Sequence, residues 1–91
     1  MPTIHLVIKG KVQGVFYRAT AKDVAEEMGI TGWVKNTDDG NVEITATGTD
    51  GQLQRLIAWC RQGPQKAIVT DVVISKKENE ETFKGFYILR R

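Results

Sequence analysis

The sequence predicts an α+β protein in which two helices cover one face of a mostly antiparallel sheet. Three observations lead to this prediction. In several segments apolar residues alternate with other residues, as they do in strands. Two further segments carry apolar residues at intervals of three and four, the spacing of an amphipathic helix. Asp39 and Gly40, between two of the strand-like segments, are typical of a hairpin turn.

The first strand is predicted at residues 3–9, where one side is apolar: Ile4, Leu6 and Ile8. The first helix is predicted at residues 18–28, and Gly29 follows it in the position of a C-terminal cap. Between these two elements lies the segment GKVQGVFYR, from Gly10 to Arg18. Its two glycines and single arginine make it the first candidate for a functional loop.

The hairpin is predicted within TGWVKNTDDGNVEITATG, residues 31–48. Its second half alternates Val42, Ile44 and Ala46 with Glu43, Thr45 and Thr47, which predicts one buried face and one face in water. The second helix follows, with its apolar residues on one side: Leu53, Leu56, Ile57 and Cys60. We expect Thr49 and Gln52 to form a capping box and Gly63-Pro64 to end this helix.

Two more strands are predicted at residues 67–75 and 83–90, joined by the charged loop KKENEET. In the last strand, Phe86 and Ile88 lie on one face, Tyr87 and Leu89 on the other. The resulting order is that of a ferredoxin-like βαββαβ sandwich with an extra C-terminal strand. Because neither a repeat nor a linker is found, residues 1–91 are expected to form one domain.

Composition narrows the class of protein further. The 91 residues are 41% apolar and 26% charged, near the averages for globular proteins. Thirteen basic residues against eleven acidic ones give a net charge of +2, too weak to indicate nucleic-acid binding by charge alone. A single cysteine, Cys60, rules out an internal disulfide and is typical of a reducing compartment. With neither a signal peptide nor an apolar run of about 18 residues, we expect a cytoplasmic protein.

The predicted topology brings two polar segments together. A crossover through the first helix makes the first two strands parallel, so their ends at Gly10 and near Asn36 lie at one edge of the sheet. One strand between them places these ends about 10 Å apart. Backbone amides at the start of a helix favour an anion, above all phosphate, and Arg18 adds a planar fork of donors and a fixed charge. The loop matches neither a Walker motif nor a dinucleotide fingerprint.

Read together, GKVQGVFYR and GWVKNTDDGNVEITATG resemble the acylphosphatase family over the whole chain, and Phe16 occupies a position that varies in that family. The resemblance implies hydrolysis of the carboxyl–phosphate anhydride of small acyl phosphates without a metal or cofactor. It assigns water positioning to Asn36. It assigns phosphate binding to Arg18 and to the loop amides, which come from Gln13, Gly14, Val15, Phe16 and Tyr17.

The chemistry of these residues agrees with the resemblance. A phosphoryl-transfer transition state carries much negative charge, which amide donors and an arginine stabilise. The leaving group is a carboxylate whose conjugate acid has a pKa of roughly 4, so no strong general acid is required. The neutral amide of Asn36 can accept a hydrogen bond from the attacking water without repelling the phosphate. We hypothesise that the substrate's own phosphate accepts the proton of the attacking water.

Other polar and aromatic residues are interpreted as structural. His5 has no predicted metal-binding partner, Cys60 lies on the apolar side of a helix, and Asp38 and Asp39 suit a turn. Thr37 is also assigned to the turn, and the two tryptophans are assigned to packing: Trp33 and Trp59.

Two rival functions are considered. The segment KGFYIL, residues 84–89, partly resembles the aromatic signature of RNA recognition domains, but it lies on the last strand instead of the third. A module that binds phosphate without turnover is the second rival, and Asn36 argues against it. We therefore expect a monomer that binds a small acyl phosphate, with inorganic phosphate as product and competitive inhibitor, and neither nucleic acid nor membrane as partner.

Overall fold

The structure, a computed structural model, describes residues 1–90, and within them the predicted order of elements is confirmed. The predicted boundaries are correct to within two or three residues, except for the last strand, which is half as long as expected. Residues 82–85 precede it as irregular chain. The elements are β1 (Thr3–Lys11), α1 (Tyr17–Glu27), β2 (Thr31–Asn36), β3 (Val42–Thr47), α2 (Asp50–Gln62), β4 (Ile68–Lys76) and β5 (Phe86–Leu89).

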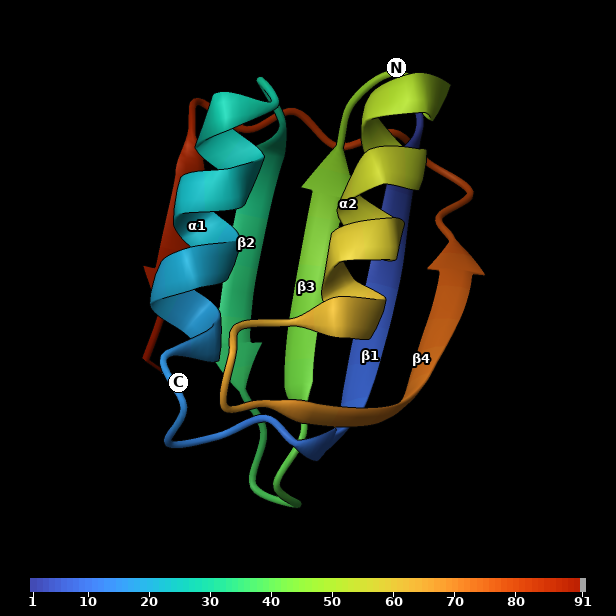
Figure 1. The fold of residues 1–91 in the computed structure, drawn as a ribbon. Coiled ribbons are helices and arrows are strands. Elements are labelled where there is room, and N and C mark those ends of the chain that lie inside the picture. Colours follow the sequence, from blue (N-terminus) through green and yellow to red (C-terminus); the bar gives the residue numbers. More distant parts are fainter. Residues whose placement is uncertain (91) are drawn as a thin grey trace.

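The strands form one sheet in the order β4-β1-β3-β2-β5. All neighbouring strands are antiparallel except β2 and β5, which run parallel. Both helices lie on the same face of this sheet, α1 over β2 and β5 and α2 over β1 and β4 (Figure 1). The α+β, ferredoxin-like architecture predicted from the sequence is therefore confirmed.

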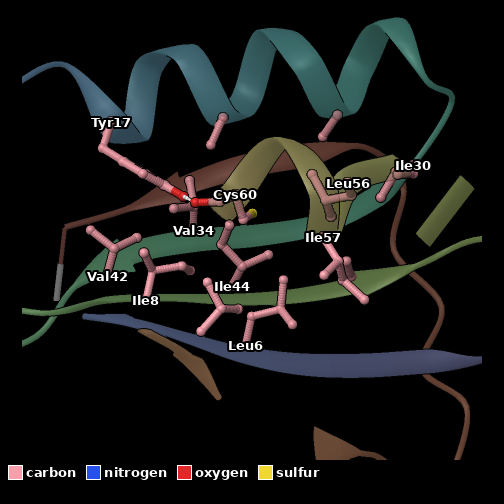
Figure 2. Close-up of a cluster of buried hydrophobic side chains, with 14 of the residues drawn as sticks. Leu6, Ile8, Tyr17, Ile30, Val34, Val42, Ile44, Leu56, Ile57 and Cys60 are labelled. Carbon is pink, nitrogen blue, oxygen red and sulfur yellow. Dashed lines mark hydrogen bonds between the residues drawn. The ribbon is translucent and has the colours of Figure 1, made fainter. Parts of the chain in front are cut away.

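The hydrophobic core fills the space between the helices and the sheet (Figure 2). The sheet contributes the alternating residues that the sequence places on its inner face, and each helix contributes its apolar side. Burying a large apolar side chain stabilises the fold by roughly 1.5–3 kcal/mol, so this cluster is the main source of stability. Its members include Leu6, Ile8, Val34, Val42, Ile44, Leu56, Ile57 and Cys60.

The opposite face of β3 differs from the sequence prediction. Thr45 and Thr47 were expected in water, but both are buried, so this prediction is wrong for them. The reason is hydrogen bonding with β1, because Thr45 Oγ1 lies 2.9 Å from His5 Nδ1 and Thr47 Oγ1 lies 2.7 Å from Thr3 Oγ1. The Thr47 hydroxyl also donates to the carbonyl oxygen of Glu81 at 2.8 Å, so the loop after β4 covers it.

The sheet topology also decides where a functional site can form. β1 and β2 are both antiparallel to β3, which lies between them, so they run parallel and end at the same edge. The loop after β1 and the β2–β3 turn meet at this edge, below the first turn of α1 in Figure 1. This agrees with the arrangement expected for the ends of the first two strands.

Candidate active site

The loop between β1 and α1 is shaped by two glycines with different roles. Gly10 has φ +124°, and a Cβ there would lie 2.1 Å from the carbonyl oxygen of Ile68, so a side chain would clash with the backbone of β4 where it pairs with the end of β1. Gly14 has φ +75° but open space around its Cβ position. Gly14 is therefore explained by its backbone conformation, because glycine adopts the positive φ of this turn without steric cost.

The loop enters α1 through Phe16, which has left-handed dihedral angles (φ 64°, ψ 24°) and precedes the helical Tyr17. A change of hand between successive residues turns backbone N–H groups toward one another and creates an anion-binding concavity. The start of α1 has no side-chain cap and no acidic residue in its first turn. Within residues 1–90, the amides of Gly14 to Arg18 have no hydrogen-bond acceptor. This end of α1 can therefore receive an anion.

Arg18 and Asn36 come together at this edge of the sheet. They line the same two pockets, one of about 560 Å³ and one of about 280 Å³. Arg18 is half-buried, and the ion pairs found within residues 1–90 do not include it. Its charge is therefore available to a ligand with negatively charged oxygens.

The side-chain oxygen of Asn36 is unusual in the protein interior. Asn36 Oδ1 is buried and has no hydrogen-bond donor among the described residues. An unsatisfied buried acceptor costs about 1–3 kcal/mol, and native structures contain few of them. Such a group is expected where a water or a substrate supplies the missing donor.

The side chains of three of the remaining predicted loop residues, Gln13, Val15 and Tyr17, hold the loop in place. Gln13 Nε2 donates to the carbonyl oxygens of Thr37 and Asn41, both at 2.8 Å, and so ties the loop to the β2–β3 turn. Val15 and Tyr17 are buried in the core. Only the backbone amides of Val15 and Tyr17 are therefore free for a ligand, and substrate contact by Gln13, Gly14, Val15, Phe16 and Tyr17 stays a prediction.

Tyr17 connects the start of α1 to the end of α2. Its hydroxyl donates to the carbonyl oxygen of Cys60 at 2.8 Å (Figure 2). The centroid of its ring lies 5.2 Å from that of the Trp59 ring. Burial raises the pKa of the Tyr17 phenol far above its ordinary value, and it raises the pKa of the Cys60 thiol to about 12. Both groups are neutral near pH 7, which supports the structural interpretation of Cys60.

The β2–β3 turn that carries Asn36 is held by its own hydrogen bonds. The Thr37 hydroxyl accepts from the Asn41 amide at 3.0 Å and donates to Asp39. This bond to Thr37 lowers the pKa of the Asp39 carboxyl below its ordinary value. The turn interpretation of Thr37 and Asp39 is supported, whereas Thr37 and Asp38 also line the larger pocket.

Two basic residues of the site were not predicted from the sequence. Arg90 lines both pockets, and Lys35 lines the larger one. Arg90 comes here because β5 pairs in parallel with β2, with Leu89 opposite Lys35, so that Arg90 follows beside Asn36. The larger pocket is lined by three cationic side chains and by two carboxylates, those of Asp38 and Glu43. The excess of positive charge favours an anion. A prediction that β5 pairs with β2 would have placed Arg90 at this edge.

Metal ligands are not gathered at this site. Among residues 1–90 there is no group of three or more His, Cys, Asp or Glu side chains that could hold a metal ion. His5 Nε2 lies 3.7 Å from Glu43 Oε1, and the His5 ring is edge-on to Trp33, with the ring centroids 6.0 Å apart. The groups that can act on a ligand here are the loop amides, the two arginines, Lys35 and the Asn36 side chain.

Comparisons with known proteins agree with this geometry. The acylphosphatase family model matches residues 4–88. An acylphosphatase of Marinobacter nauticus is 46% identical over 82 residues, which cover 90% of this chain and 89% of that protein. The acylphosphatase structure from Bacillus subtilis is 34% identical with a TM-score of 0.94, and covers 98% of this chain and 99% of its own. The one from Coxiella burnetii is 38% identical with a TM-score of 0.93, over 97% and 92% of the two chains. This chain therefore belongs to the acylphosphatase family of acyl phosphate hydrolases.

Proposed function

We propose that this protein hydrolyses the carboxyl–phosphate bond of small acyl phosphates by in-line attack of a water that Asn36 positions. Arg18 and the loop amides hold the phosphoryl group. The observation that carries the proposal is that Arg18 and Asn36 line the same pockets, while the Oδ1 atom of Asn36 is buried and has no hydrogen-bond donor among the described residues. Membership of the family supports the reaction, and this geometry supports the two roles.

The phosphoryl group is bound by donors that the fold leaves unpaired. Amides of the loop and of the first turn of α1 surround its oxygens at the positive end of the helix dipole. Arg18 pairs with two of the oxygens through its planar guanidinium. In the loose transition state negative charge is spread over the three phosphoryl oxygens and grows on the leaving carboxylate oxygen, and preorganised donors fixed around the phosphoryl group stabilise it.

The attacking water is oriented by Asn36. Its Oδ1 accepts a hydrogen bond from the water and holds the water oxygen in line with the bond that breaks. The new bond forms between the water oxygen and phosphorus, and the bond between phosphorus and the acyl oxygen breaks. The electron pair leaves with the carboxylate, and the water proton passes to a phosphate oxygen.

Neither a general acid nor a metal is required by this scheme. The leaving carboxylate is a weak base, with a conjugate acid of pKa roughly 4, so it leaves without protonation. The positive charge that a metal would supply comes from Arg18, with Arg90 and Lys35 nearby. A carboxylate base beside the phosphate would be repelled, whereas Asn36 is neutral.

The test is hydrolysis of benzoyl phosphate in the presence of EDTA. We expect turnover by the wild type, a loss of roughly three orders of magnitude in Arg18→Ala, and roughly two in Asn36→Ala. Arg55→Ala and Asn79→Ala are matched controls, because both residues are exposed and outside the two pockets. Circular dichroism checks that every variant is folded.

Three results would contradict the proposal. Activity within about tenfold of wild type in Arg18→Ala would remove Arg18 from the transition state, and wild-type activity in Asn36→Ala would remove Asn36 from water positioning. A folded wild type that binds inorganic phosphate but hydrolyses nothing would favour the phosphate-binding module.

The remaining properties follow from the same site and from composition. We propose that inorganic phosphate inhibits competitively, because it presents the oxygens that the loop binds. We propose that the chain acts in the cytoplasm as one domain, because its sequence has one cysteine and neither a repeat nor a linker. We also propose that it acts as a monomer. None of the helices within residues 1–90 has the length and apolar character to cross a membrane.

A further inference from the structure

The two pockets share three residues and differ in their other walls. Both are lined by Arg18, Asn36 and Arg90. The larger pocket continues along charged side chains, Lys35 and Glu43 among them. The smaller one has an apolar side formed by Val12, Phe16 and Ile88. A phosphoryl group at Arg18 therefore has a charged region and an apolar region next to it.

An in-line displacement gives these regions different uses. The attacking water and the leaving carboxylate lie on opposite sides of phosphorus, so they cannot occupy the same region. Water is stabilised by the polar walls of the larger pocket, while an apolar acyl group gains from contact with apolar walls. Polarity thus assigns the water to the larger pocket and the acyl group to the smaller.

Phe16 is the residue of the smaller pocket that the fold does not explain. Its side chain is 81% exposed, more than any other large hydrophobic side chain within residues 1–90. Its left-handed backbone is uncommon for a bulky residue, whereas glycine and asparagine adopt it readily. The turn therefore does not require a phenylalanine, and its ring contributes little to the core.

We infer that the smaller pocket takes the acyl group and that the Phe16 side chain packs on it, which gives the enzyme a preference for aromatic or other bulky apolar acyl groups. This inference rests on the proposed hydrolysis. It assigns a role to the Phe16 side chain in addition to that of its amide.

The size of the pocket agrees with such a group. A cavity of about 150 Å³ lined by apolar side chains admits benzene, and the smaller pocket has about 280 Å³. A benzoyl ring fits there and can stack on or meet the edge of the Phe16 ring. An acetyl group would leave most of the volume to water.

The test compares two substrates within each variant. The quantity is the ratio of kcat/KM for benzoyl phosphate to kcat/KM for acetyl phosphate. Because both substrates carry the same phosphoryl group, a disturbance of the loop amides affects both and cancels in the ratio. Phe16→Asn removes the ring and retains a residue that tolerates the left-handed backbone. Phe16→Tyr keeps a ring, and Ile68→Asn changes an exposed apolar residue that lines neither pocket.

We expect the ratio to fall about five- to tenfold in Phe16→Asn and to stay within about twofold in the two controls. An unchanged ratio in Phe16→Asn, with the wild type hydrolysing both substrates, would overturn this inference and leave the proposed function standing. An equal fall in Ile68→Asn would overturn it too. A wild type that hydrolyses neither substrate would overturn the proposed function and this inference together.

Discussion

The two helices of this protein begin in opposite ways. At the start of α2, the Gln52 amide donates to the Thr49 hydroxyl at 3.2 Å, and the Thr49 amide donates to Gln52 Oε1 at 2.8 Å. Asp50 adds a negative charge in the first turn. The start of α1 has no side-chain cap, no acidic residue in its first turn, and the cation Arg18 instead.

The difference teaches how a helix start can serve either stability or binding. Every helix begins with unpaired N–H groups and a partial positive charge. In α2 the chain itself supplies the acceptors and the negative charge, and such a cap is worth about 0.5–2 kcal/mol. In α1 these groups are left for a ligand, and the helix is fixed by buried residues such as Tyr17. The proposed substrate supplies the acceptors that the sequence omits.

Among changes that exchange features between the two helix starts, the largest effect is expected when α1 receives the charge that α2 carries. Ala19 is exposed, belongs to the first turn of α1 and lines the smaller pocket. In Ala19→Glu the carboxylate repels the phosphoryl group, so we expect kcat/KM for acetyl phosphate to fall about ten- to hundredfold. The same charge interacts favourably with the helix dipole, so urea unfolding should show a gain of about 0.3–1 kcal/mol.

Ala19→Gln separates charge from size in this experiment, because glutamine has the shape of glutamate without its charge. It should keep most of the activity and gain no dipole stabilisation. An equal loss of activity in Ala19→Gln would show that bulk, and not charge, blocks the site. The contrast between the two helix starts would then lose its electrostatic explanation.

A smaller effect, on stability alone, is expected when α2 loses its cap. Thr49→Ala removes the hydroxyl that accepts from the Gln52 amide, which should lower the free energy of unfolding by about 1 kcal/mol. Activity should not change, since Thr49 lines neither pocket. Thr82→Ala, at an exposed loop threonine, should stay within about 0.5 kcal/mol of wild type. A reduced kcat/KM in Thr49→Ala would mean that the two helix starts are coupled.

The same contrast explains which features can be predicted from the sequence. The capping box of α2 depends only on Thr49 and Gln52, three residues apart, so a local pattern predicts it. The meeting of Arg18 and Asn36 depends on strand order, which the hairpin and the crossover rule determine. Both kinds of information are present in a single chain.

Features that depend on distant neighbours could not be predicted in the same way. Arg90 reaches the site only because β5 pairs in parallel with β2. Thr45 is buried because His5, on another strand, covers it with a hydrogen bond. Phe16 has a left-handed backbone, which phenylalanine rarely adopts, so its residue type predicts a different conformation. Each depends on tertiary contacts that residue spacing does not contain.

The smallest effect is expected for Asp50→Asn, the counterpart of Ala19→Glu. Removing the charge from the first turn of α2 should cost about 0.3–1 kcal/mol, with activity unchanged because Asp50 lines neither pocket. Varying the salt concentration tests whether the helix dipole causes these changes in stability. Between low salt and about 1 M, where the Debye length is about 3 Å, the loss in Asp50→Asn and the gain in Ala19→Glu should both shrink. If either change in stability is the same at both salt concentrations, packing or a hydrogen bond accounts for it, and the two helix starts do not differ through their charges.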